Sequence, residues 1–268
     1  MKKSLVVVAT ILVVICLCPV LARGQEIPGT KSTSLFVVGG GWSVKVNLLN
    51  TSPDPIKFNM LFFDQAGQGL KVRDVYGDLF YATSIGQPIQ PGGSWEITLD
   101  SPSPTPQHGS LMVRVFTPTT VNGELVFVPK DFELSSVIYL RNPAGELIAQ
   151  APVFSMAPMS DVFLAFTANS KTKERTGVAI ANHTWTPTVA LLEVVDNNGI
   201  VLGRGQTKTL PANAQMAMFV DEMVSIPDGT SGRLRIQSYI PIVVAGLAAT
   251  VNSRGEFLIS TERVFPGK

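Results

Sequence analysis

The sequence predicts an all-β protein built from two tandem antiparallel β-sandwich modules. The first observation is an internal repeat at a constant offset of 132 residues, in which the same spacing of one Asn, one Pro, one Asp and one Gly occurs twice: Asn50, Pro55, Asp64 and Gly67, then Asn182, Pro187, Asp196 and Gly199. The second is a series of short β-type segments separated by turn signals, which is typical of sandwiches. The third is that no stretch has a helical period sustained over several turns. A long-period repeat decides the domain count, so we expect two copies of one module.

Each copy of the repeat is expected to form a strand, a bend, a longer strand and a tight turn. The segment 188–195 of the second copy is rich in β-branched and aliphatic residues, which suit a half-buried pleated surface. The Asp and Gly that follow favour a chain reversal, because Asp bonds to its own backbone and Gly accepts positive φ. The eight repeated residues are therefore interpreted as structural turn positions.

Residues 1–24 have the pattern of a secretory signal peptide. Lys2 and Lys3 precede an apolar run from Leu5 to Leu21, and small residues flank a cleavage site before Gln25. An uncleaved anchor is the alternative, although the run lies at the short end for a membrane-spanning helix. Both cysteines of the chain fall within this segment, each after a bulky residue, which argues against lipidation. The mature protein is thus expected to be secreted, periplasmic or extracellular, with no membrane span and no disulfide.

The charge of the chain gives no indication of a nucleic-acid partner. Removing the three basic residues of the signal segment from the 21 Lys and Arg leaves 18 against 20 acidic residues, a net charge of −2. No basic patch and no acidic tail stands out. The 244 residues that follow the signal are long enough for two modules that each bury a core without disulfides.

The elements of the first module are assigned in chain order. Residues 25–33 are expected to be a flexible leader, and 34–155 to form the module. The three glycines 39–41 favour a turn over a phosphate-binding loop, because the alternating segment 42–48 that follows predicts a strand rather than a helix. The proline-rich segment 101–106 is expected to be a stiff surface loop.

The first module carries an insertion, 71–90, that the second module lacks. Its aromatic residues, Tyr76, Phe80 and Tyr81, suggest a possible surface for stacking against a sugar or a peptide. The competing interpretation is that they pack onto the edge of the sandwich. A short linker ending at Ser160 then leads into the second module, 161–268.

These features resemble the tandem immunoglobulin-like repeats of bacterial secreted and cell-surface proteins. The resemblance rests on the Gly-rich opening, the Asn-x4-Pro bend and the Asp-x2-Gly turn before a proline-led strand, and it covers nearly the whole mature chain. It implies a role in structure, adhesion or spacing at the cell envelope, and no transferable active site. In a bacterial protein the glycosylation patterns at Asn50 and Asn182 would be incidental.

No catalytic or metal-binding constellation stands out in the sequence. The two histidines, His108 and His183, have no partners at metal-ligand spacing, and Gly-x-Ser-x-Gly does not occur. Asp74 and Asp78 are the remaining candidates for paired carboxylates. Asp196 with its two following asparagines is the best local candidate for calcium, although one loop supplies few ligands and a plain turn is favoured. We therefore expect no enzyme activity, no cofactor and no metal.

The sequence favours a non-catalytic secreted or envelope-associated protein that binds an unknown envelope protein or polysaccharide. The alternatives are a periplasmic pilus-assembly-type chaperone, which donates a strand to its client, and a carbohydrate-binding accessory protein of a hydrolase. The cationic residue pair of such chaperones is not identifiable in this sequence. The oligomeric state is left open, since exposed edge strands would permit association by sheet extension.

Overall fold

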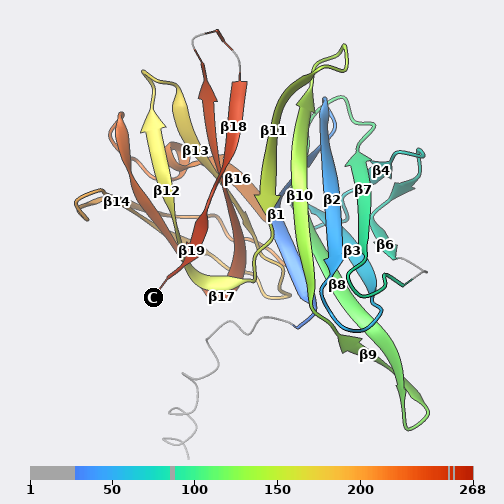
Figure 1. The fold of residues 1–268 in the computed structure, drawn as a ribbon. Helices are drawn as coiled ribbons and strands as arrows, with labels where there is room; N and C mark the ends of the chain where they lie inside the picture. The colour runs from blue at the N-terminus through green and yellow to red at the C-terminus, as the bar shows by residue number, and fades with distance from the viewer. Residues whose placement is uncertain (1–27, 85–87, 253, 256, 268) are drawn as a thin grey trace, which may run out of the picture.

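The computed structural model describes residues 28–84, 88–252, 254–255 and 257–267 (Figure 1). The predicted signal peptide, 1–24, lies outside the described residues. Within these residues the fold is almost entirely antiparallel β-structure with one four-residue helix, as expected for an all-β protein. No helix in the described part of the chain is long and apolar enough to cross a membrane.

The first half of the molecule, residues 30–154, contains two antiparallel sheets. One has the order β1-β8-β3-β6, with β9 attached to β8, and the other has the order β11-β10-β2-β7-β4-β5. The strand bounds are β1 Thr30–Val38, β2 Trp42–Asn50, β3 Lys57–Asp64, β4 Val72–Asp74, β5 Leu79–Phe80, β6 Ala82–Ser84, β7 Ser94–Asp100, β8 Gln107–Val121, β9 Glu124–Pro129, β10 Phe132–Arg141 and β11 Leu147–Phe154.

The second half, residues 159–266, repeats this strand order without counterparts of β4 and β5, and one long strand, β17, takes the places of both β8 and β10. The first part of β17 pairs with β12 and β14, and its second part pairs with β13 and β18. The bounds are β12 Met159–Asn169, β13 Glu174–Ala181, β14 Ala190–Asp196, β15 Val201–Gln206, β16 Gln215–Phe219, α2 Val220–Met223, β17 Thr230–Val251, β18 Phe257–Glu262 and β19 Val264–Pro266.

The two copies of the repeat occupy equivalent places in the two halves. Asp64 is opposite Gly109 in the pairing of β3 with β8, and Asp196 is opposite Gly232 in the pairing of β14 with β17. A Cβ on Gly109 would lie 2.0 Å from the carbonyl oxygen of Phe63, and one on Gly232 would lie 2.1 Å from that of Val195. Both glycines therefore allow the same close approach of two strands.

Each half has its own apolar core, which the alternation of its strands creates. Phe58, Met60 and Phe62 of β3 are almost fully buried, and Leu192 and Val194 hold the matching positions in β14. Because side chains alternate between the faces of a strand, every second residue of these segments points inward.

The halves are packed directly against each other. β1 is buried along nearly its whole length, and the core of the first half extends to Ala179 and Ala245 of the second. The hydroxyl of Ser34 in β1 donates a hydrogen bond of 3.0 Å to the carbonyl oxygen of Ala179. Small residues on the outer face of β13 and β17 allow this close contact, because a larger side chain there would hold the halves apart.

Two predicted boundaries need correction. β1 begins at Thr30, inside the segment 25–33 predicted to be a flexible leader, and Thr30–Thr33 pair with Arg114–Leu111 of β8. The polar side chains hid this strand, because Ser32 and Thr33 are buried where the two halves meet and not exposed on a terminal extension. β12 begins at Met159, so the connection between the halves is shorter than the predicted linker.

Candidate functional site

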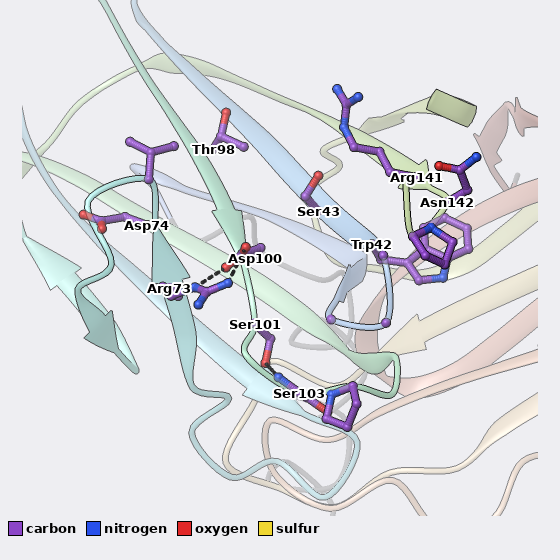
Figure 2. A pocket seen from close by; sticks show the side chains of 16 residues that line it. Trp42, Ser43, Arg73, Asp74, Thr98, Asp100, Ser101, Ser103, Arg141 and Asn142 are labelled. Atoms are coloured by element: carbon purple, nitrogen blue, oxygen red, sulfur yellow. Dashed lines mark hydrogen bonds and ion pairs between the residues drawn. The ribbon is translucent and has the colours of Figure 1, made fainter. Parts of the chain in front are cut away.

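A polar hollow of about 700 Å³ lies at one end of the first half (Figure 2). It occupies the outer face of the sheet that contains β2, β7 and β4, and loops close it at one end. It is lined by Gly39, Gly40, Gly41, Trp42, Ser43, Arg73, Asp74, Val75, Thr98, Asp100, Ser101, Ser103, Pro104, Arg141, Asn142 and Pro143.

The floor of the hollow follows from strand alternation. Val44 of β2 and Leu99 of β7 are paired and fully buried in the core. Their neighbours Ser43, Thr98 and Asp100 therefore point to the opposite, outer face of the sheet. This places two hydroxyl groups and one carboxylate on a rigid surface, where they can bind polar groups of a ligand.

A bidentate ion pair holds one side of the floor. Nε and Nη2 of Arg73 donate hydrogen bonds of 2.8 Å to Oδ1 and Oδ2 of Asp100. The two residues are directly opposite in the pairing of β4 with β7, which aligns the guanidinium with the carboxylate. The hydrogen bonds to Asp100 raise the pKa of Arg73 above its ordinary value. Asp100 therefore serves mainly to fix the guanidinium in place.

The glycine turn forms the rim nearest the second half. Gly39 and Trp42 exchange two backbone hydrogen bonds of 3.0 Å, and both residues between them have positive φ, as a two-residue hairpin of type I′ requires. A Cβ on Gly40 would lie 2.8 Å from Pro106, and one on Gly41 would lie 2.4 Å from the carbonyl oxygen of Arg141. The turn thus packs tightly against the loop 101–106 and the end of β10.

The second guanidinium of the hollow, that of Arg141, is exposed. Its Nη1 donates one hydrogen bond of 2.9 Å to the carbonyl oxygen of Gly145, and its side chain extends away from the ring of Trp42 (Figure 2). Arginine has five N–H donors in a planar fork, which suits carboxylate and other planar acceptors. The arrangement can therefore bind a polar ligand that carries hydrogen-bond acceptors.

The structure separates the three aromatic residues predicted to form a binding loop. Tyr76 is at the tip of the turn between β4 and β5, with 87% of its surface exposed, beside the hollow but outside its lining. Phe80 packs against the core, with its ring centroid 6.0 Å from that of Phe62. Tyr81 is exposed between β5 and β6, where the ammonium of Lys71 lies 5.9 Å from its ring centroid. They do not form one stacking surface.

The eight repeated residues lie in turns and bends. Asn50 and Asn182 are fully buried, and each donates from its side-chain amide to the carbonyl oxygen four residues later, at 2.8 and 2.9 Å. Pro55 and Pro187 are exposed and directly precede equivalent bridges, Ile56 with Ile89 and Thr188 with Leu210.

The Asp and Gly of each copy form the same kind of turn. Oδ1 of Asp64 accepts hydrogen bonds from the backbone N–H groups of Ala66 and Gln68, while Gly67 has a φ of 81°. Asp196 and Gly199 repeat this arrangement, with a φ of 83° at the glycine. Backbone hydrogen bonds, that of Ile200 foremost, lower the pKa of Asp196. Asp74 likewise accepts from the N–H groups of Tyr76 and Asp78.

His183 is buried at the boundary between the halves. Its Nε2 lies 2.8 Å from the hydroxyl oxygen of Ser110, which is also fully buried, and its Nδ1 has no hydrogen-bonding partner within the described residues. Burial and the positive charge of Arg114 lower its pKa to about 4. A Ser–His pair with no group to orient the imidazole and no access for a substrate does not form a catalytic triad.

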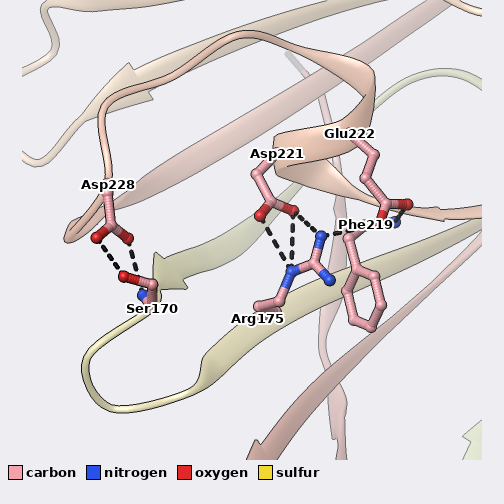
Figure 3. Close-up of polar contacts among 6 residues, drawn as sticks. All are labelled: Ser170, Arg175, Phe219, Asp221, Glu222 and Asp228. Atoms are coloured by element: carbon pink, nitrogen blue, oxygen red, sulfur yellow. Dashed lines mark hydrogen bonds and ion pairs between the residues drawn. The ribbon is translucent and has the colours of Figure 1, made fainter.

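A smaller apolar hollow of about 310 Å³ lies between the halves. Leu35, Trp42 and His108 face the outer surface of β13, β16 and β17 across it, so Trp42 borders both hollows. Phe219 forms part of its wall, and the guanidinium carbon of Arg175 lies 3.8 Å from the Phe219 ring centroid (Figure 3).

Ion pairs hold the edge of this apolar hollow in place. Arg175 also contacts both Asp221 and Glu222 of α2, each at 2.9 Å. The loop that follows α2 is fixed by a hydrogen bond of 2.8 Å from the backbone N–H of Ser170 to the carboxylate of Asp228 (Figure 3).

Groups of three or more metal-ligating side chains are absent from the part of the chain that the structure describes.

Sequence reasoning missed two features of the first half. The polar hollow is assembled from four separated segments of the chain, and the sequence holds no signal for their convergence. The second is a hairpin, formed by the end of β8 and by β9, that projects from the body (Figure 1). Its signal is present as Asn122-Gly123 between two β-type segments, and both residues have positive φ.

Comparison with known proteins shows only distant similarity. No family model matches the chain, and no curated protein matches it. Among solved structures, Thermotoga maritima 1070 has 10% identity and a TM-score of 0.34, covering 42% of this chain and 100% of its own. The Anabaena sensory rhodopsin transducer has 19% identity and a TM-score of 0.29, covering 33% of this chain and 95% of its own. A glycoside hydrolase family 2 β-glucuronidase covers 91% of this chain but 25% of its own, with 12% identity and a TM-score of 0.17.

Proposed function

We propose that the protein is a non-catalytic, secreted binding protein of the cell envelope, built from two immunoglobulin-like modules, and that its ligand is a polysaccharide. The observation that carries the proposal is the polar hollow of about 700 Å³ on the outer face of the first half. Its lining includes hydroxyl, amide and guanidinium groups and one indole ring, the kinds of groups that can contact the hydroxyls and the ring faces of a sugar.

The rigidity of this hollow supports binding rather than catalysis. Its two carboxylates both have structural partners, since Asp100 is bound to Arg73 and Asp74 holds the backbone of its own turn. Glycoside hydrolysis in most families requires one carboxyl group to donate a proton and another to act as base or nucleophile. Groups fixed by strand ends and bidentate contacts instead favour selective, preorganised recognition.

The proposal is tested by measuring the affinity of the secreted protein for a panel of purified envelope polysaccharides by titration calorimetry. We expect Arg141→Ala to weaken binding about tenfold or more, because a hydrogen bond to a charged group contributes about 1.5–3 kcal/mol. Arg141 is exposed, so the variant is expected to fold normally, and its circular dichroism should match that of the wild type.

Arg204→Ala is the matched control, because this arginine is also exposed and pairs with Glu193 on the second half. It should leave the affinity unchanged. Absence of binding by the wild type to every acidic and neutral polysaccharide, or equal affinities of wild type and Arg141→Ala, would contradict the proposed function.

A further inference from the structure

The hairpin missed by sequence reasoning forms an arm, residues 117–129, with two free edges. β8 pairs with β3 only as far as Phe116, so the rest of β8 pairs with β9 alone. Within the described residues, β9 pairs with no strand other than β8. Figure 1 shows the arm extending away from the body of the molecule. Each edge therefore carries backbone N–H and C=O groups that can pair with another strand.

The arm is apolar and almost uncharged although it projects into solvent. Leu125 and Phe127, on one face, have 63% and 57% of their surfaces exposed, and Val126 and Val121, on the other, have 40% and 48%. Glu124 is its one charged residue. A two-stranded ribbon is marginally stable by itself in water. The exposed apolar residues on both faces therefore suggest that another strand pairs with the arm and extends it.

The fold of the module does not require the arm. In the second half, the single strand β17 takes the places that β8 and β10 have in the first half. In the first half the arm stands between β8 and β10, whereas β17 continues without a break. The offset between equivalent positions falls from 123 at Gly109 and Gly232 to 110 at Asn142 and Asn252, so the first half has thirteen additional residues here. The arm is thus an addition to a module that closes without it.

We propose that the arm pairs with the arm of a second copy of this chain, β9 against β9, antiparallel about a two-fold axis at Val126. In this register Leu125 is opposite Phe127 of the second copy, and Val126 is opposite its own equivalent. Glu124 is opposite Val128, so no like charges face each other across the axis. Such an interface is self-complementary, because every contact occurs twice.

The self-complementary sequence favours a second copy over an unrelated strand. Pairing places the exposed leucine and phenylalanine of both copies on one face of a four-stranded sheet, where they cover each other. The six residues of β9 span only about 20 Å at roughly 3.4 Å per residue. A single strand pair of this length buries less than the roughly 800 Å² per partner of a standard interface. The dimer is therefore expected to dissociate on dilution.

The test is the molar mass of the protein across a range of concentrations, measured by sedimentation velocity and light scattering. We expect the wild-type mass to rise from one chain to two with concentration. Val126→Lys and Val126→Glu should each remain monomeric, because like charges would oppose each other at the axis. An equimolar mixture of the two variants should recover the dimer, and this recovery also shows that both variants are folded.

Val201→Lys is the matched control, because Val201 is a valine of similar exposure, 42%, on the edge strand β15 of the second half. It should dimerise like the wild type. A wild type that stays monomeric at about 0.5 mM, a concentration well above that of a weak micromolar complex, would overturn the inference. So would dimerisation of Val126→Lys alone, or failure of the mixture to recover the dimer. None of these outcomes depends on polysaccharide binding.

Discussion

At the scale of single residues, the most unusual group in the protein is His183. Its imidazole is buried between the halves beside Ser110 and Phe63, and burial together with Arg114 lowers its pKa to about 4. The neutral form is therefore the one that the folded protein accommodates. Protonation would place a charge close to a guanidinium, in a site from which water is excluded.

This lowered pKa predicts that acid destabilises the protein. The unfolded chain binds the proton more readily, since its histidine pKa is about 6.5. The contribution of neutral His183 to the free energy of unfolding is therefore complete above about pH 6.5. It decreases by roughly 3 kcal/mol as the pH falls to about 4. Urea unfolding at several pH values measures the loss. His183→Gln should flatten the profile in that interval, and an unchanged profile would contradict this role.

The repeated asparagines show how far residue-level reasoning extends. The sequence marked Asn50 and Asn182 as turn positions, and each caps a bend from a fully buried site. Their burial was not predictable, because an Asn-x4-Pro spacing fixes a local bend and not the strands that cover it. The aromatic residues of the insertion illustrate the same limit, since Phe80 packs against the core while Tyr76 is exposed to solvent.

At the scale of elements, the closest strand contacts depend on glycine. Gly109 allows β8 to lie against β3, as Gly232 allows β17 to lie against β14. The alternating segments predicted most strands of both halves, because periodicity is a local property. It did not predict the start of β1, whose polar residues are buried by a distant part of the chain.

The close contact at Gly109 predicts a large effect of a small substitution. Gly109→Ala would place a Cβ 2.0 Å from the carbonyl oxygen of Phe63, so β3 and β8 would have to separate. We expect a loss of about 2–4 kcal/mol in the free energy of unfolding, which places it among strongly destabilising substitutions. Gly177→Ala is the control, because a Cβ there would meet no atom closer than 3.7 Å. Equal stability of the two variants in chemical denaturation would contradict the explanation.

At the scale of the whole molecule, the two halves share a buried surface. The core of the first half includes Ala179 and Ala245 of the second, and it also includes residues of β1. The internal repeat predicted two equivalent units but gave no information on how they pack. Their packing depends on the outer face of β13, where small residues meet β1, and no spacing in the sequence marks such a face.

This shared surface predicts that the halves unfold together. Differential scanning calorimetry of the wild type should show one transition. Ala179→Glu should lower its midpoint sharply or divide it in two, because an unpaired carboxylate would be buried between the halves. Ala165→Glu, on the exposed face of β12, should have little effect. Two well-separated transitions in the wild type would show that the contact contributes little.

The burial of β1 on both sides also determines the order in which the chain can mature. β1, which ends at Val38, is synthesised long before Ala245, which belongs to the same core. Until the segment around Ala245 emerges, the environment of β1 is incomplete and the first half cannot finish folding. Contacts so distant in sequence are slow to form. β1 is therefore expected to remain accessible to proteases until β17 has been synthesised and has paired.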